Sequence, residues 1–338
     1  MIKIDGSRGE GGGQVLRTSL ALSMATGQPF TIENIRAGRK KPGLMRQHLT
    51  SVLAAREVCQ GEVKGAELNS TALSFHPGEI ASGDYHFAIG SAGGTGLVFQ
   101  TVFPALLLAD EASTLKLEGG THNGMSPPFE SLADSFLRAL QPIGVEAELD
   151  LKRSGFYPAG GGLVTGRVAP SALDRKLDLT ERGALKRIHG EARVSNLKGN
   201  IAEREIKVAS EALGLDEGAI VMRDAQSLGP GNTLLIWVEF EHHTEVYSAV
   251  GEQGVRAERV AERAAKEVRR HVNSNAAVGQ HLADQLLLPM ALGSGGRFTT
   301  LPPTEHFTTN VETIGKFLDV PIRYEPVENG VYLVEVGR

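Results

Sequence analysis

The sequence GEGGGQVLR occupies residues 9–17 and follows a short apolar start at residues 2–4. An apolar-periodic segment begins directly after it, so this order predicts a strand, a glycine turn and a helix. Three consecutive glycines leave the backbone open to a ligand, and their amides, with the first turn of a helix, can bind an anion such as phosphate. The alternative is that the glycines only make a tight turn.

One carboxylate, Glu10, lies inside this glycine turn. A bare phosphate would repel it. We therefore predict that Glu10 is a ligand for a divalent cation that accompanies the phosphates, with a helix N-terminal charge as the alternative.

Similar glycine turns return three times, as GSAGGTG at residues 90–96, PAGGG at residues 158–162 and GSGG at residues 293–296. Their spacing is too uneven for a solenoid. We predict related α/β units packed around one centre, with the glycine turns gathered at one end.

Length and composition favour a cytoplasmic protein of two domains. The chain has 338 residues, 41% of them hydrophobic, and its single cysteine, Cys59, cannot form an internal disulfide, which suits a reducing compartment. We expect no secretory signal and no membrane partner, because the longest apolar stretch, residues 97–109, contains Gln100 and Pro104 and is too short to span a bilayer.

The net charge of −5 argues against a protein that coats long nucleic acid. Binding one end of a nucleic acid needs only a local basic patch. Residues 36–48 (RAGRKKPGLMRQH) supply such a patch, with five Lys and Arg residues and no acid. An ordinary solvated loop is the alternative, but a basic loop after the second strand of a unit lies near the glycine turn of the first, so both can serve one anionic ligand.

The order of elements changes at about residue 177. Strand, helix, three strands and helix follow one another, which is a βαβββα order, and the earlier pattern resumes at residue 279. We predict an α/β (α+β) fold in which a small inserted domain, residues 177–275, interrupts a large domain of residues 1–176 and 276–338.

Several chemistries are excluded by missing motifs. The sequence has no His-Glu-x-x-His, no Gly-x-Ser-x-Gly and no Gly-Lys-Ser/Thr. In a dinucleotide-binding fold, Glu33 would lie roughly where an acid that binds the ribose is expected. However, Gln14 stands where the third glycine of that motif should be, and regular βαβ units do not continue. His306 remains as a candidate nucleophile before a helix, with an exposed or structural histidine as the alternative.

Six segments together resemble the RNA 3′-terminal phosphate cyclase family: EGGGQVLR at 10–17, IRAGR at 35–39, KPGL at 41–44, QH at 47–48, FYPAGGG at 156–162 and LADQ at 282–285. The resemblance covers nearly the whole chain. It implies a large domain of three repeated α/β units with a small inserted domain. It also implies the catalytic branch, because His306 stands in the C-terminal turn that carries the nucleophile.

The resemblance implies ATP-dependent conversion of an RNA 3′-terminal phosphate to a 2′,3′-cyclic phosphodiester, through AMP on His306 and an RNA adenylate. It places the nucleotide pocket at Gln100, Pro128, His281, Leu282, Ala283, Asp284 and Gln285. It makes Glu10 a ligand of Mg²⁺ or Mn²⁺. The residues implied for the RNA end are Arg17, Arg36, Arg39, Arg46, Gln47 and His48.

Two other functions stay open at this point, a noncatalytic scaffold for ribosomal RNA processing and an enzyme similar to the enolpyruvyl transferases. The sequence also leaves open whether copies of the chain form a homo-oligomer.

Overall fold

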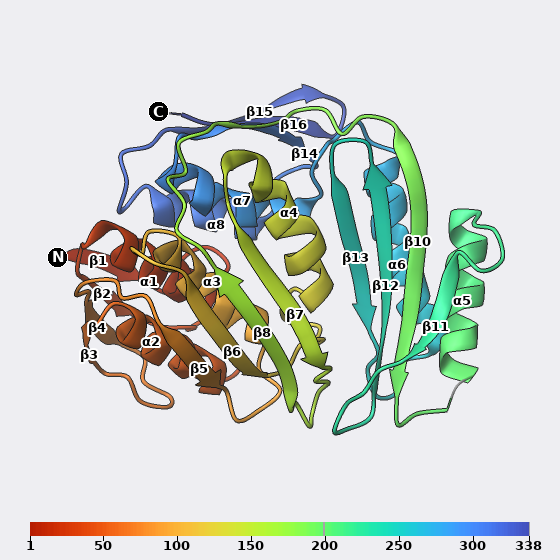
Figure 1. Cartoon of the computed structure of the whole chain (residues 1–338), viewed down its shortest axis with the longest axis horizontal. Coiled ribbons are helices and arrows are strands. Elements are labelled where there is room, and N and C mark those ends of the chain that lie inside the picture. Colours follow the sequence, from red (N-terminus) through yellow and green to blue (C-terminus); the bar gives the residue numbers. More distant parts are fainter. Residues whose placement is uncertain (199, 338) are drawn as a thin grey trace.

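The computed structural model describes residues 1–198 and 200–337, which form a mixed α/β protein with four sheets of four strands each (Figure 1). Three of the sheets belong to units that repeat the order βαβαββ.

The first unit contains β1 (Ile2–Asp5), α1 (Gln14–Thr26), β2 (Phe30–Glu33), α2 (Arg46–Val58), β3 (Glu62–Lys64) and β4 (Leu73–His76). The second contains β5 (Asp84–Ala88), α3 (Thr95–Leu106), β6 (Ser113–Gly119), the π-helix η1 (Ser131–Phe136), α4 (Leu137–Leu140), the 3₁₀ turn η2 (Gln141–Ile143), β7 (Ala147–Arg153) and β8 (Gly162–Val168). The third contains β9 (Leu177–Leu179), α7 (Gln280–Leu292), β14 (Gly296–Thr300), α8 (Glu305–Ile314), β15 (Ile322–Glu328) and β16 (Val331–Val336).

The three units share one sheet topology. Their strand orders are β1-β2-β4-β3, β5-β6-β8-β7 and β9-β14-β16-β15. In each unit the first two strands are parallel, and the remaining neighbours are antiparallel. The predicted α/β fold with three repeated units is therefore confirmed.

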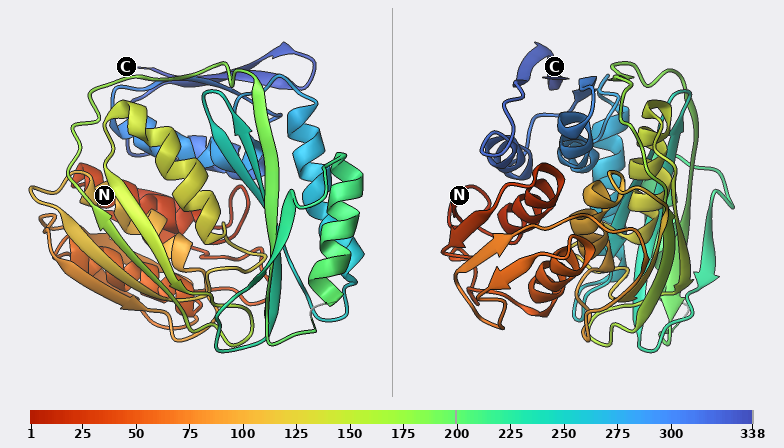
Figure 2. Two further views of the ribbon diagram at one scale, coloured as in Figure 1. Left: turned by 45° about the vertical axis from the view of Figure 1, so that its right-hand side comes forward. Right: turned by 60° about the vertical axis from the view of Figure 1, so that its left-hand side comes forward.

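The helices of the three units pack together in one core, with the sheets around them (Figure 2). α1 contacts α2, α3 and α8. Its apolar residues Leu16 and Leu20 are fully buried, and Phe99 of α3 joins the same cluster. Burying a side chain of this size stabilises the fold by about 1.5–3 kcal/mol, so the central helices are held chiefly by one another.

A fourth sheet belongs to the inserted unit, which occupies the right of Figure 1. It contains β10 (Leu185–Ser195), α5 (Asn200–Leu213), β11 (Ile220–Asp224), β12 (Gly231–Phe240), β13 (Thr244–Val250) and α6 (Ala257–Val272), in the predicted βαβββα order. The sheet order is β11-β10-β12-β13, and α5 and α6 cover one face with a hydrophobic cluster of their own. The period of α6 explains this packing, because Val260, Ala264 and Val268 recur on one buried face.

The edge strand β13 lies against η1 of the second unit. The hydroxyl of Ser135 accepts a hydrogen bond from Val246 N at 2.9 Å, and the hydroxyl of Ser131 donates to Val246 O at 3.1 Å. Asp134 accepts from the indole N–H of Trp237 at 2.9 Å. The free backbone groups of an edge strand need such partners, and here a π-helix supplies them. This rare form of helix is found frequently at functional sites.

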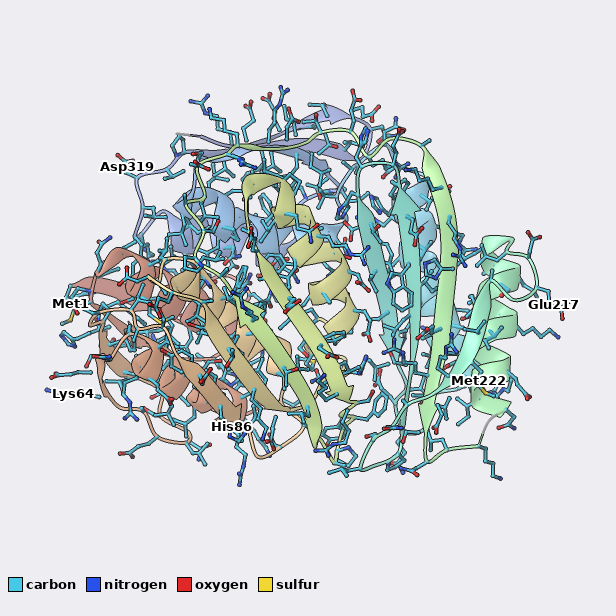
Figure 3. All side chains as sticks on the ribbon, in the orientation of Figure 1. Met1, Lys64, His86, Glu217, Met222 and Asp319 are labelled. Atoms are coloured by element: carbon cyan, nitrogen blue, oxygen red, sulfur yellow. The ribbon has the colours of Figure 1, made fainter. Side chains whose placement is uncertain are left out.

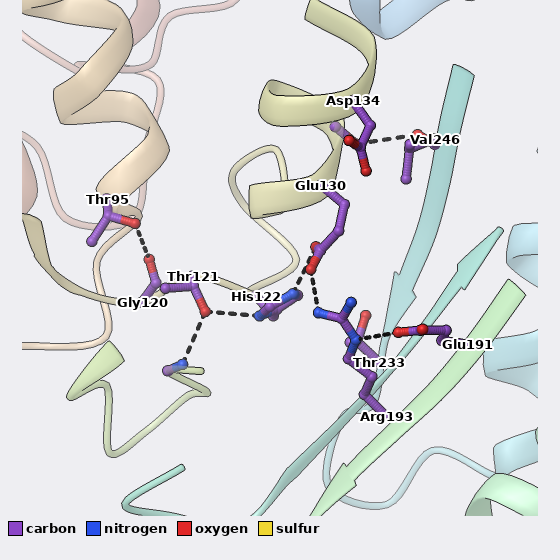
Figure 4. A network of polar contacts seen from close by, with 12 residues as sticks. Thr95, Gly120, Thr121, His122, Glu130, Asp134, Glu191, Arg193, Thr233 and Val246 are labelled. Atoms are coloured by element: carbon purple, nitrogen blue, oxygen red, sulfur yellow. Dashed lines mark hydrogen bonds and ion pairs between the residues drawn. The ribbon is translucent and has the colours of Figure 1, made fainter. Parts of the chain in front are cut away.

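A buried charge network also joins the second unit to the inserted one (Figure 4). His122 Nε2 lies 2.9 Å from Glu130 Oε2, and Arg193 of β10 forms an ion pair with the other oxygen of the same carboxylate. Burial would raise the pKa of Glu130, but the contacts with His122 and Arg193 outweigh it and hold the pKa at about 2. Separating the two units would leave this buried carboxylate without its arginine.

Polar side chains such as Lys64, Glu217 and Asp319 lie at the periphery of the molecule (Figure 3). The large apolar side chains are gathered mainly in the clusters described above, with single exceptions such as Met222 on β11, which is 53% exposed. Within residues 1–198 and 200–337, no helix has the length and apolar character needed to cross a membrane.

The two ends of the insertion meet at Thr299 of β14. The Thr299 hydroxyl donates to Thr180 O at 2.8 Å and accepts from Ala277 N at 3.0 Å. Because β9 pairs with β14 in the sheet of the third unit, it belongs with the repeated units rather than with the insertion. We therefore propose an inserted domain that starts after β9, slightly later than the predicted division at residue 177.

This boundary can be tested by excision. A chain in which a short Gly/Ser linker joins Thr180 to Ala277 should fold, because both residues contact the same hydroxyl and the remaining units keep their own core. Circular dichroism and thermal unfolding would measure this. A cooperative transition for both the shortened chain and the separate insert is expected, and two unfolded fragments would refute the boundary.

Candidate active site

Three glycines of the turn, Gly9, Gly12 and Gly13, lie so close to neighbouring side chains that a Cβ would overlap them. Gly9 and Gly11 have φ of 60° and 61°, in the left-handed region that favours glycine. A Cβ on Gly12 would overlap the Glu10 carboxylate, and one on Gly13 would overlap the ring of His48 and lie 2.6 Å from Arg17 Nη1. These glycines thus bring charged and polar side chains directly onto the backbone, besides making the turn.

Several helix N-termini meet at this turn. The first residue of α1, Gln14, contacts Asp284 in α7 and His306 in α8, while His48 in the first turn of α2 lies against Gly13. α1 and α2 have no acid in the first turn, and their N-caps, Gly13 and Met45, make no side-chain cap hydrogen bond. The positive ends of the α1 and α2 dipoles therefore lie near this turn without a side-chain cap, which favours an anion.

The position of His306 determines which of its ring nitrogens can react. Its Nδ1 lies 2.8 Å from Gln14 Oε1. The orientation of the Gln14 amide is set by its other end, where Nε2 donates to Asp284 Oδ2 at 3.2 Å. Because an amide oxygen only accepts, Nδ1 must carry the proton, and Nε2 keeps the lone pair.

The surroundings of His306 favour the neutral ring. Desolvation lowers its pKa from the ordinary value, and the charges of Arg17, His281 and Arg39 lower it further. The imidazole is thus neutral at physiological pH, with a nucleophilic nitrogen in a cationic environment. This combination suits attack on an anionic phosphorus centre.

Asp284 is the carboxylate behind this arrangement. Burial raises its pKa to about 7, and the charges of His281 and Arg17 and the hydrogen bond from Gln14 only partly offset that effect. Asn310 donates from Nδ2 to Asp284 O at 2.8 Å, and Thr18 donates to Asn310 Oδ1 at 2.7 Å. The backbone and the side chain of Asp284 are therefore both tied to the helices that hold His306.

Glu10, the predicted metal ligand, is engaged with protein partners. One carboxylate oxygen accepts from Gly12 N at 2.8 Å, the other pairs with Arg39, and Glu10 N donates to Thr309 Oγ1 at 3.0 Å. No cluster of three or more His, Cys, Asp or Glu residues suited to a metal ion occurs in the described part of the chain. Because Glu10 is paired with Arg39 in this arrangement, its role as a metal ligand remains a prediction.

The basic loop is placed only partly as predicted. Arg36 turns inward and donates to Lys41 O and Gly43 O at 2.7 and 2.8 Å, and Gln47 is buried and donates to Ser51. Burial, with the charges of Arg17, Arg36 and Arg39, lowers the pKa of His48 to about 3, so this ring is neutral. Arg46 is exposed, and its side chain forms no ion pair with any described residue.

The residues predicted for the nucleotide pocket fall into two groups. His281, Leu282, Ala283, Asp284 and Gln285 form the first turns of α7 beside His306, with Leu282 and Ala283 buried. Gln100 lies in α3 and Pro128 precedes η1, both in the second unit. The Gln100 side chain makes no hydrogen bond to another described residue, so a role for these two residues remains a prediction.

Three polar residues at the site were not among the predicted ones. Thr18, Thr309 and Asn310 are buried and connect the glycine turn, α7 and α8. His306 was expected in a turn before a helix, but α8 already begins at Glu305, with Thr304 accepting from Phe307 N as the N-cap. A Ser/Thr cap followed by polar residues at a helical spacing was the available signal.

The three repeated units bring together a site in which a neutral histidine, His306, lies near cationic side chains. A family model described as RNA 3′-terminal phosphate cyclase matches residues 8–324. A curated relative from Koribacter versatilis (strain Ellin345), named RNA 3′-terminal phosphate cyclase, is 49% identical over 330 residues, which cover 97% of this chain and 93% of the relative. The chain belongs to the RNA 3′-terminal phosphate cyclase family, as its motifs predicted.

The hydrogen bond from Gln14 predicts a fixed tautomer. In nitrogen-15 NMR spectra of the histidine side chains, His306 should carry its proton on Nδ1 and titrate with a midpoint below its ordinary 6.5, since its pKa is lowered. Gln14→Ala should give a mixture of tautomers. Gln28→Ala is a matched control, because Gln28 donates to Phe317 O elsewhere in the molecule and should leave His306 unchanged. A wild-type proton on Nε2 would contradict the assignment.

Proposed function

We propose that this chain is an ATP-dependent enzyme that converts the 3′-terminal phosphate of an RNA to a 2′,3′-cyclic phosphodiester. The observation that carries the proposal is the His306 ring, whose Nδ1 is held by Gln14 and whose Nε2 lone pair lies among cations and helix N-termini. Membership of the cyclase family supplies the substrate class, and the histidine supplies the chemistry.

In the first step, His306 Nε2 attacks the α-phosphorus of ATP. An N–P bond forms, the bond to the β-phosphate oxygen breaks, and pyrophosphate leaves. The ring then carries AMP on Nε2 and a proton on Nδ1, so it becomes positively charged. Gln14 Oε1 accepts from that proton, and the Asp284 carboxyl group behind the amide stabilises the charge in its ionised form, which its pKa of about 7 makes accessible at neutral pH.

In the second step, an oxygen of the RNA 3′-phosphate attacks the phosphorus of the AMP, and the N–P bond breaks. The neighbouring 2′-hydroxyl then attacks the activated 3′-phosphate and loses its proton to solvent, the cyclic diester forms, and AMP leaves as the bond to its phosphate oxygen breaks. The obstacle is repulsion between two anions. We assign the reduction of this repulsion to Arg17 and Arg39, whose charges act on His306, and to the exposed Arg46.

For binding, we propose that the first turns of α7, His281 to Gln285, contact the nucleotide, together with Gln100 and Pro128. The RNA end is assigned to Arg17, Arg39 and Arg46, whereas Arg36, Gln47 and neutral His48 support the loop. A divalent cation remains a prediction from the family. We derive no step through it, because Arg39 is paired with Glu10.

The covalent adduct is the direct test. With labelled ATP the protein should retain AMP as a phosphoramidate that survives alkali and is lost in acid, because protonation of the nitrogen weakens the N–P bond. His306→Ala should abolish it. A noncatalytic scaffold or an enolpyruvyl transferase would retain no AMP.

Peptide mapping must place the label, because His48 and His281 lie close to the same space. His306→Asn keeps a polar group of similar reach without a nucleophilic nitrogen and should also remain unlabelled. AMP on His48, His281 or a lysine would show that the mechanism is wrong even if the cyclase activity is present.

The RNA end can be separated from the nucleotide step. Arg46→Ala should slow cyclisation by roughly tenfold and leave AMP transfer to His306 unchanged, because a lost charged contact costs about 1–3 kcal/mol. Adding Arg39→Ala should deepen the cyclisation defect, but it also opens the ion pair with Glu10. Arg56→Ala, at the other end of α2, is the matched control. Equal losses in both steps for Arg46→Ala would count against this division.

A further inference from the structure

The inserted domain holds the beginning of α7 through one buried carboxylate. Glu245 of β13 is 4% exposed, and its Oε1 accepts a hydrogen bond of 2.6 Å from the backbone N–H of Gly279. Gly279 is the N-cap residue of α7 and has no cap of its own. A carboxylate at this place both accepts from the helix start and complements the helix dipole.

Gly279 is packed tightly in this position. A Cβ there would lie 2.6 Å from the hydroxyl of Tyr247 and 3.2 Å from Glu245 Oε1. β13 therefore lies directly against the backbone at the start of α7. The contact restricts movement of α7 along its axis and rotation about that axis.

Two contacts on the surface hold the same turn. Arg270 of α6 donates to Gln280 Oε1 at 2.7 Å, and Glu267 of α6 lies 3.5 Å from His281 Nε2. These exposed contacts are individually weak. With Glu245, they connect three consecutive residues of α7 to the inserted domain.

The charge on Glu245 is supported from within the insertion. Burial would raise its pKa, but His243, at 3.4 Å, and His271, together with the Gly279 N–H, outweigh burial and lower it. A buried carboxylate that remains ionised must keep its partners, because an uncompensated buried charge is costly. The contact with Gly279 is therefore a persistent part of the fold.

The chain topology shows what this contact replaces. In the first two units the connection from the first strand to the first helix is a short glycine-rich turn, at residues 6–13 and 89–94. In the third unit the corresponding connection, between β9 and α7, is the whole insertion. The helix that a local turn would position is instead positioned by β13 and α6.

We propose that Glu245 is a positioning residue for His306. Through α7, the inserted domain fixes the position and orientation of the His306 ring. The path runs from Glu245 to Gly279, along the first turns of α7 to Asp284, and from Asp284 through Gln14 to His306. Asn310 ties the Asp284 backbone to α8 and makes the connection rigid. The proposal rests on the proposed function, because the rate of AMP transfer to His306 is the measurement that reports the orientation of its ring.

The test compares Glu245→Ala, Glu245→Gln and Ser131→Ala in the full-length chain. The rate of AMP transfer to His306 is measured in a single turnover at saturating ATP, beside the midpoint of thermal unfolding. Glu245→Ala should lower the rate about tenfold, the order expected when reacting groups lose alignment. Glu245→Gln should stay within about twofold of wild type, because its amide oxygen can still accept from Gly279 N–H. Ser131→Ala removes a hydrogen bond to the adjacent Val246 but keeps the bond between Glu245 and Gly279, so it should leave the rate unchanged.

The proposal is overturned if folded Glu245→Ala transfers AMP at the wild-type rate, if Ser131→Ala slows transfer equally, or if Glu245→Gln is as slow as Glu245→Ala. Should Glu245→Ala fail to fold, Glu267→Ala combined with Arg270→Ala cuts the exposed contacts on the same turn and should slow transfer about threefold; an unchanged rate refutes the proposal. If wild type carries no AMP on His306, the proposed function fails. The proposal about position is then decided by NMR, which should show His306 fixed with its proton on Nδ1 in wild type and as mixed tautomers in the variant.

Discussion

The two hydrogen bonds of the Gln14 side-chain amide are the interaction on which the site depends, because one end of the amide donates and the other accepts. Its nitrogen donates to Asp284 in α7, and its oxygen accepts from His306 in α8. An amide can do both at once only in one orientation, so the identity of Asp284 determines the tautomer of a histidine that it does not contact directly. A glutamate or leucine at position 14 would fill a similar volume without this polarity.

The repeated architecture explains how such distant residues meet. Each unit places its first helix after its first strand, so the helices of all three units pack in a common core. Glycines at the start of α1 let Arg17 and His48 lie against the backbone, where a Cβ would displace them. The concentration of cationic side chains and helix N-termini is thus a consequence of one packing arrangement, rather than of separate binding motifs.

Much of the fold could be predicted from the sequence, because strand and helix periods and glycine turns are local signals. The βαβββα insertion and the related α/β units belong to this part, whereas the number of three units was implied by the resemblance to the cyclase family. The start of α8 could not be fixed, since Thr309 and Asn310 read as turn residues until the contacts with Glu10 N and Thr18 show what they satisfy. Those partners lie about three hundred residues away in the chain, and no local pattern encodes them.

The same limit applies to the charged residues of the site. Composition identified the basic loop, but the sequence could not show that Arg36 would satisfy carbonyls of its own loop or that Arg39 would pair with Glu10. Burial decides such choices, and burial depends on tertiary packing. His48 illustrates the point, because a ring predicted to bind an RNA end is so desolvated among arginines that it stays neutral.

Two buried carboxylates join the inserted domain to the repeated units, and the free-energy cost of separating them from their partners opposes movement of the domain. Glu130 of the second unit holds Arg193 of β10, and Glu245 of β13 holds the start of α7. Removing the partner of a buried charge costs about 3–5 kcal/mol, so a rotation of the domain that broke both contacts would cost a large fraction of the stability of a typical protein. A loop connected only by its ends would have no such constraint. The insertion is therefore better described as a domain held rigidly against the second and third units than as one that moves on a hinge, which is the property that the proposed positioning of α7 requires.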